Sequence, residues 1–420
     1  MYKIKTLKNG LTLITINLPH LNSVTSLVAV GAGSRYETKS ISGISHFLEH
    51  MFFKGSTKYP TAEQIATLVD GIGAINNAAT DKEITYYWIK SAARHIELSS
   101  DILSSMLKDS LFEEKEIEKE KGVIVEEIRM YLDMPQRYVW DLYEKLQFGD
   151  QPLGWDVAGE EAIVNKLERA DFLKYMDGLY KAENMALVYV GNLPDDIEDL
   201  AEKYFGDLKK GAKTIFEPYH KEIQLEPKVH IFNKPTDQIN LVLGVEGFDR
   251  VDEKRYAARV LGMILGEGMS SRLFNEIREK RGLAYHISAS HSSYHDTGAF
   301  AVYGGVKQEK LKDALEVIRE ELEKTTKTQV SPMELEKAKE MERGRIALRS
   351  ESTNFLAEHF GVKFILDREL ETFEDYIKHI EAVTVEDVQL AAVDLFKNEK
   401  YNLEMIGPLE GPDQYKKILS

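Results

Sequence analysis

The 420-residue sequence predicts an α+β protein built from two homologous domains. Three observations predict this fold class. Stretches with period-two alternation are followed by stretches with helical spacing, as expected when helices are layered on sheets. A segment near the middle of the chain recurs near its end, which indicates an internal duplication. The length and the 43% hydrophobic content are sufficient for two sizeable cores.

The first half begins with strands and continues with helices. The stretch YKIKTLKNGLTLITI alternates on either side of Asn9-Gly10, a strong hairpin signal. The stretch ISGISHFLEHMFFKG has apolar residues at intervals of three and four, which predicts a buried helix that stops at Gly55. The further expected elements are a helix over 62–69, a strand over 84–90, a helix over 93–107 and a long charged helix from Glu113 to about Leu146.

The two halves end with similar sequences. Residues 180–193 (YKAENMALVYVGNL) line up with residues 396–409 (FKNEKYNLEMIGPL), so each half closes with a strand that ends in glycine. The Lys-rich segment 209–228 lies between the halves and is the natural linker. The sequence therefore predicts domains over 1–213 and 214–420.

The duplication has one chemical asymmetry. Where the first copy has HFLEHM, the second has RVLGMI (Arg259 to Ile264), with the same helical spacing. Since this position in the fold accepts an apolar helix, packing does not demand His46 and His50.

Composition excludes several classes of function. The chain has 54 basic and 70 acidic side chains, a formal charge of −16, which disfavours a nucleic-acid partner and favours cationic ligands. It has no cysteine, so any metal must be held by His, Asp and Glu. No run reaches the length of a membrane span, and the N-terminus has no signal-peptide pattern. We expect a cytoplasmic protein without a membrane span.

The stretch HFLEH has the spacing of a metal site. On a helix, His46 and His50 are neighbours on one face, with Glu49 at its edge. Two imidazoles can occupy two positions of a tetrahedral zinc, which leaves Glu49 to act as general base on a metal-bound water. The order H-x-x-E-H is the inverse of H-E-x-x-H. The alternative is that the histidines are incidental.

A catalytic zinc needs a third protein ligand. In the helix FEEKEIEKEKGVIVEEIRMYLD, periodicity places Glu127 on the apolar face with Glu120 two turns before it, whereas Glu126 faces outward. A buried carboxylate needs a partner, and a metal is one such partner. Glu120 would then hydrogen-bond a ligand. A buried network with Arg or Lys is the alternative for the pair.

HFLEH followed by EKGVIVEEI resembles the inverted-motif zinc peptidases of the pitrilysin and insulin-degrading enzyme family. The two homologous halves in 420 residues resemble its mitochondrial-processing-peptidase-like, half-size bacterial branch, and the resemblance covers the full length. It implies two α/β-sandwich domains with mixed, mostly antiparallel sheets, which together make half of a clamshell. It also implies His46, His50 and Glu127 as zinc ligands, Glu49 as general base and Glu120 as supporting acid.

The resemblance implies two substrate-binding elements. NNAAT resembles the family's edge strand that accepts the substrate backbone, which would put Asn77 and Ala78 beside the scissile peptide. Arg278 and Tyr285 resemble an arginine and tyrosine pair that binds the substrate carbonyl and stabilises the oxyanion. Two further arginines compete with Arg278 for this role, namely Arg272 and Arg281.

These observations together predict a zinc-dependent endopeptidase that cleaves peptides or extended protein segments inside a chamber. Because this chain is half of the family's clamshell and keeps both the ligands and the Arg/Tyr pair, we expect a homodimer, with a heterodimer with a related subunit as the alternative. The rival function is a non-catalytic structural or peptide-binding subunit, like the core proteins of the respiratory bc1 complex that share the fold.

Overall fold

The computed structural model describes residues 2–211 and 215–420, so the expected boundary at 213/214 lies outside the described residues. The chain forms two compact units, each assembled from three separate ranges. Unit 1 consists of Met1–Arg129, Trp155–Glu217 and Ala347–Glu371. Unit 2 consists of Met130–Gly154, Pro218–Ile346 and Thr372–Ser420.

The sheet of unit 1 has six strands in the order β1-β2-β6-β3-β5-β4. The expected hairpin around Asn9-Gly10 is confirmed, since β1 and β2 pair antiparallel and Gly10 has a positive φ of 93°. Only the β2–β6 pair is parallel. The strands are β1 Tyr2–Thr6, β2 Thr12–Asn17, β3 Ser23–Val30, β4 Ile75–Thr80, β5 Thr85–Ala92 and β6 Met185–Gly191.

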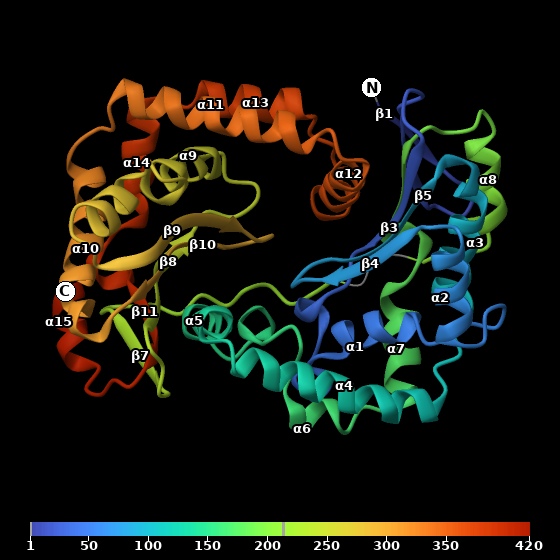
Figure 1. Ribbon diagram of the computed structural model, residues 1–420, viewed down its shortest axis with the longest axis horizontal. Helices are drawn as coiled ribbons and strands as arrows, with labels where there is room; N and C mark the ends of the chain where they lie inside the picture. Colours follow the sequence, from blue (N-terminus) through green and yellow to red (C-terminus); the bar gives the residue numbers. More distant parts are fainter. Residues whose placement is uncertain (1, 212–214) are drawn as a thin grey trace. The chain divides into compact units, whose positions relative to one another are not determined.

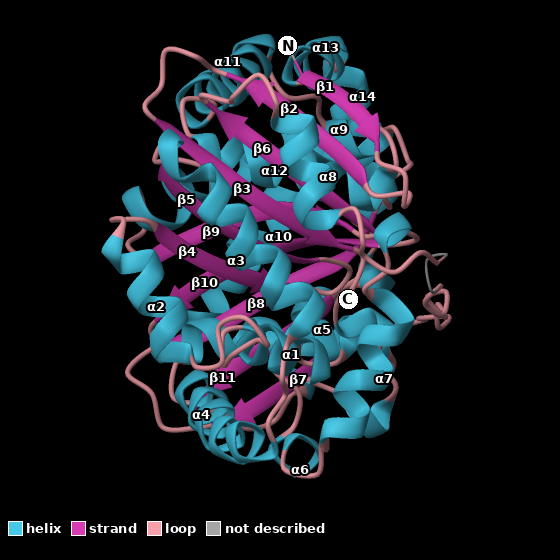
Figure 2. Cartoon of the chain, turned by 90° about the vertical axis from the view of Figure 1, so that its right-hand side faces the viewer, coloured by secondary structure: helices cyan, strands magenta, loops and turns pink. Residues whose placement is uncertain are grey.

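Helices of the first half cover one face of this sheet and bury its main core. In Figure 1, α3 and α8 lie on one side of β3 and β5, and Figure 2 shows the same two helices in front of the strands. The helices that contribute buried residues to this core are α1 Ile44–Phe52, α2 Ala62–Gly71, α3 Ile96–Asp109, α4 Glu114–Leu132, α6 Glu161–Val164, α7 Arg169–Leu179 and α8 Ile197–Phe205.

Unit 2 repeats this topology with one strand fewer, in the order β7-β11-β8-β10-β9. The parallel pair β7–β11 corresponds to β2–β6, as expected for a duplication. The strands are β7 Lys228–Asn233, β8 Ile239–Gly247, β9 Ala284–Ser293, β10 Gly298–Val306 and β11 Asn402–Gly407. The helices are α9 Lys254–Gly266, α10 Leu311–Lys327, α11 Pro332–Arg349, α13 Phe373–Ala382, α14 Val385–Leu395 and α15 Asp413–Leu419, with a π-helical turn over Phe274–Glu279.

Each unit covers the second face of its sheet with a helix from the other half of the sequence. Helix α12 (Thr353–Asp367) lies on β3 and β6 of unit 1, where Thr25 donates a hydrogen bond to Asn354 at 2.8 Å. Helix α5 (Pro135–Phe148) packs on β8 and β11 of unit 2. The two helices follow α11 and α4 respectively, so equivalent elements of the duplicated halves are exchanged.

The expectation of a single long helix from Glu113 to about Leu146 is wrong. The chain forms α4 and α5 with a break before Pro135, where Met134 has the non-helical angles φ −115° and ψ 82°. Proline lacks the amide hydrogen and disfavours a helical conformation at the preceding residue. The break allows α4 to stay mostly in unit 1 while α5 joins unit 2.

Among residues 2–211 and 215–420, none of the helices has the length and hydrophobicity needed to span a bilayer.

Candidate metal centre

Helix α1 presents its polar side chains on one face because its apolar face is anchored in the core of unit 1. Phe47, Leu48 and Met51 are buried, whereas His46 and His50 are only partly buried. Gly43 precedes the first residue of the helix. Its φ of 93° favours glycine, which has no side chain that could cap the helix. The histidine rings lie with their centroids 4.7 Å apart.

Helix α4 brings the third group to these histidines. One oxygen of Glu127 lies 3.7 Å from Nε2 of His46 and 3.5 Å from Nε2 of His50. Ligand atoms of the three residues all lie within 4.8 Å of one another, and no other such group of three occurs in the described part of the chain. Glu126 is exposed and pairs with Arg129, so the two adjacent glutamates have different environments.

Glu120 lies behind His50. Its Oε1 accepts a hydrogen bond from Nδ1 of His50 at 2.9 Å, and its Oε2 forms an ion pair with Lys54. The Glu120 side chain is only 2% exposed. Because Nδ1 of His50 is engaged in this way, Nε2 faces Glu127 with its lone pair available for a metal.

The two histidines have opposite pKa shifts. Burial, reinforced by the neighbouring His50, lowers the pKa of His46 to about 4, so its imidazole is neutral near pH 7. Burial also lowers the pKa of His50, but the hydrogen bond to Glu120 and the nearby carboxylates outweigh it, and the net pKa is raised. Two imidazole nitrogens and one carboxylate oxygen, with a fourth position open, form the donor set of a catalytic zinc. The residues therefore fit this metal.

Glu49 lies beside the ligands and is held by a strand. The hydroxyl of Thr80, at the end of β4, donates a hydrogen bond to Oε2 of Glu49. Burial raises the pKa of Glu49, although the Thr80 hydrogen bond and His50 oppose the shift. A partly buried carboxylate with a raised pKa is a stronger base than an exposed one.

The predicted substrate-binding residues Asn77 and Ala78 lie on β4, one of the two edge strands of the unit 1 sheet. Asn77 is exposed, and its Oδ1 accepts a hydrogen bond from the amide of Ala78 at 2.9 Å. An edge strand offers backbone groups that can pair with an extended peptide.

Arg278 and Tyr285 lie together in unit 2. The Arg278 guanidinium is 5.0 Å from the centroid of the Tyr285 ring, and Tyr285 is 74% exposed. All three candidate arginines have an acidic neighbour, and Arg278 lies 3.8 Å from Glu279. Arg272 makes two hydrogen bonds to Glu334, at 2.6 and 3.0 Å, and Arg281 pairs with Glu276.

Sequence reasoning missed Lys54 and Thr80. Lys54 follows His50 by one helical turn, a spacing that could have pointed to it. Thr80 belongs to the stretch NNAAT, but its contact with Glu49 depends on how β4 lies against α1, which no local pattern shows.

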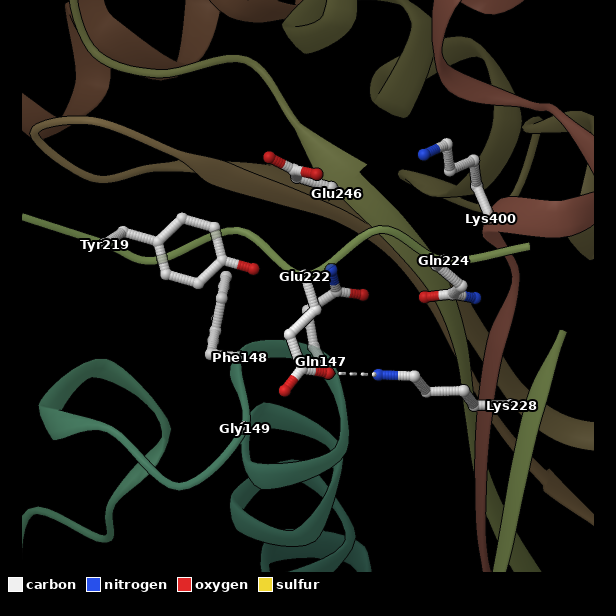
Figure 3. Close-up of a pocket in the computed structure, with 9 residues that line it drawn as sticks. All are labelled: Gln147, Phe148, Gly149, Tyr219, Glu222, Gln224, Lys228, Glu246 and Lys400. Carbon is white, nitrogen blue, oxygen red and sulfur yellow. Dashed lines mark hydrogen bonds and ion pairs between the residues drawn. The ribbon is translucent and has the colours of Figure 1, made fainter. Parts of the chain in front are cut away.

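A small pocket in unit 2 is a separate feature (Figure 3). Its cavity is about 20 Å³, room for one water, and Glu222 and Lys228 face each other in it at 3.4 Å. The described residues that line it include no histidine.

Comparisons with known proteins identify the family. Residues 12–161 match the model of the insulinase family, peptidase family M16, and residues 166–342 match the model of the peptidase M16 inactive domain. The name of the second model agrees with the absence of metal-ligand groups from the described part of unit 2.

Similar proteins span the whole chain. A Bacillus subtilis protein named "Uncharacterized zinc protease YmxG" is 38% identical, over 97% of this chain and 98% of its own. A Rickettsia bellii protein named "Uncharacterized zinc protease" is 35% identical over the same shares. The crystal structure of a Helicobacter pylori protease has the same fold, with a TM-score of 0.90 at 24% identity, over 97% of this chain and 99% of that one. The chain belongs to the M16 peptidase family.

Proposed function

We propose that the protein is a zinc-dependent endopeptidase that cleaves peptides or extended protein segments. The observation that carries the proposal is the convergence of His46, His50 and Glu127, with Glu49 beside them. The relatives named zinc proteases support the choice of metal.

A bound zinc would supply a Lewis acid that polarises water and the scissile carbonyl. Glu49, a partly buried carboxylate, takes the proton from the attacking water and later passes it to the leaving amine. Thr80 holds one oxygen of Glu49 and so leaves the other for the proton.

Substrate binding is assigned to two places. The edge strand β4 pairs with the backbone of an extended substrate at Asn77 and Ala78. Arg278 and Tyr285 bind the substrate carbonyl and stabilise the developing oxyanion. Backbone pairing depends on the extended shape of the peptide, so we expect broad sequence specificity.

The test combines zinc analysis with cleavage of a quenched fluorescent peptide. Glu49→Gln keeps zinc and loses cleavage, whereas His50→Ala loses both. Glu127→Gln loses zinc affinity, and Glu126→Gln on the same helix is the matched control that changes neither. Cleavage by Glu49→Gln at the wild-type rate would overturn the mechanism. Zinc binding without any cleavage by the wild type would support a peptide-binding subunit instead.

We also propose that two copies of the chain form the working enzyme. Support comes from the presence of both the metal ligands and the Arg/Tyr pair in one chain. Light scattering during size-exclusion chromatography should give twice the mass of 47.9 kDa. A monomer that cleaves peptide at the full rate would contradict this proposal.

A further inference from the structure

Lys54 forms an ion pair with the residue that supports a metal ligand. Its ammonium group contacts Oε2 of Glu120, while Oε1 of the same carboxylate accepts the hydrogen bond from His50. The Lys54 side chain is 23% exposed and that of Glu120 is 2% exposed. Lys54 therefore pairs with Oε2 of a buried carboxylate, and Oε1 of the same carboxylate orients His50.

The charges of the centre explain why a cation lies at the position of Lys54. Three carboxylates belong to the centre, those of Glu49, Glu120 and Glu127. Against a dication they leave one negative charge in excess, and Lys54 neutralises it. A buried carboxylate that loses its cation is strongly destabilised, so the Glu120 side chain turns toward solvent. This change removes the acceptor for the Nδ1 proton of His50.

The duplicated half provides an internal comparison. HFLEHM aligns with RVLGMI, and EIEKEK at the start of α4 aligns with ELEKAK at the start of α11. Under this alignment, Ala338 replaces Glu120 and Glu267 replaces Lys54. The lysine and the acid that it contacts are therefore replaced together with the metal ligands.

The replacement in unit 2 reverses the sign of the charges. The positions of His46 and Glu127 hold Arg259 and Arg345 in unit 2, and both arginines form ion pairs with Glu267. In each unit, the residue at the position of Lys54 carries a charge opposite to that of the cluster that it contacts. This pattern is expected if the position serves to balance the cluster, because the surrounding fold is the same in both units.

We propose that Lys54 is a positioning residue of the metal centre, which fixes the orientation of the Glu120 carboxylate so that His50 presents Nε2 to the metal. The proposal rests on the proposed function, since it requires that the centre binds zinc. Lys54 acts through Glu120 and touches neither metal nor substrate.

The experiment measures the zinc dissociation constant by competition with a chromophoric chelator. Lys54→Met should raise it about tenfold, the lower end of the range for outer partners of metal ligands. Lys54→Arg should restore most of the affinity because it keeps the charge. Lys58→Met is the matched control, since Lys58 pairs with Asp101 and stays half exposed. Its dissociation constant should equal that of the wild type.

A second arm separates positioning from a general effect on stability. Glu120→Gln should weaken zinc binding by itself, and adding Lys54→Met should cause no further loss, because the lysine acts through this carboxylate. The inference is overturned if Lys54→Met binds zinc as the wild type does, or if its effect persists in the Glu120→Gln background. If the wild type binds no zinc, both the proposed function and the inference fail. If the wild type binds zinc and cleaves peptide while Lys54→Met is unchanged, only the inference fails.

Discussion

Glu37 acts as a distant cap for the helix that carries the histidines. Its carboxylate accepts hydrogen bonds from the amides of Gly43 at 2.7 Å and Ser45 at 2.8 Å, and from the Ser45 hydroxyl at 2.6 Å. These amides are among the first of α1, which have no partner within the helix. A glycine cannot supply a capping side chain, so a residue from the preceding loop satisfies them.

Glu37→Ala should lower the free energy of unfolding of the metal-free protein by about 2 kcal/mol, because it removes the cap and leaves buried amides unpaired. Urea unfolding followed by circular dichroism measures this change. Glu63→Ala, at an exposed position in the first turn of α2, is the control and should stay within about 0.5 kcal/mol of the wild type. Equal losses in the two variants would show that Glu37 does not act as a cap.

Glu37 should also make stability depend on pH. Burial raises the pKa of Glu37 from 4.5 to about 7, although the Ser45 and Gly43 donors and Lys82 oppose the shift. A raised carboxyl pKa gives stability that is present at low pH and is lost as pH rises through the folded pKa. The unfolding free energy of the wild type, measured relative to that of Glu37→Gln, should therefore fall between pH 5 and pH 8, by at most about 3 kcal/mol. A difference that grows over this range would contradict the assignment.

At the scale of elements, α12 depends on a glycine that lets it approach the sheet. A Cβ on Gly361 would lie 2.9 Å from Leu27 and 3.1 Å from Val188, on two neighbouring strands. Gly361→Val should therefore destabilise the protein by about 2 kcal/mol through overpacking. Gly344→Ala in α11 is the matched control, since no atom lies within 4 Å of the added Cβ. It should stabilise by about 0.5 kcal/mol through helix propensity. Thermal unfolding of both variants measures these changes in stability.

Local patterns predicted α1, α2, β5 and α3 but not the end of α4. The charged residues after Glu113 have helical spacing up to Leu146, and Pro135 was the sign that the spacing does not describe one helix. Periodicity did distinguish the exposed Glu126 from Glu127, because the two face different sides of the same helix. It gave no sign that the apolar neighbours Val123 and Met130 would be nearly half exposed.

For the whole molecule, the exchange of α5 and α12 makes each unit depend on both halves of the sequence. A chain of residues 1–211 lacks α12, so the face of β3 and β6 that this helix covers would be open to water. We expect that 1–211 and 215–420 do not unfold cooperatively when each is alone, and that the mixture regains a cooperative transition. Near-ultraviolet circular dichroism with urea measures this. Cooperative unfolding of 1–211 alone at the wild-type midpoint would contradict it.

The net charge of −16 predicts a preference among substrates. Peptides rich in Lys and Arg should be cleaved faster than Glu-rich peptides of equal length, because the field of the protein attracts cations. The difference should shrink as salt is added, since ions screen charges over a Debye length of about 8 Å at physiological ionic strength. Equal rates at low salt would exclude this effect.

The sequence by itself determined the duplication, the hairpin at Asn9-Gly10 and the faces of the helices that carry His46, His50 and Glu127. These features follow from local periodicity and turn chemistry, which the chain shows without its fold. Only the tertiary structure decided that α1 and α4 meet, that Thr80 holds Glu49, and that α5 and α12 are exchanged. Each of these depends on contacts between residues far apart in the chain, and local spacing carries no information about which distant elements pack together.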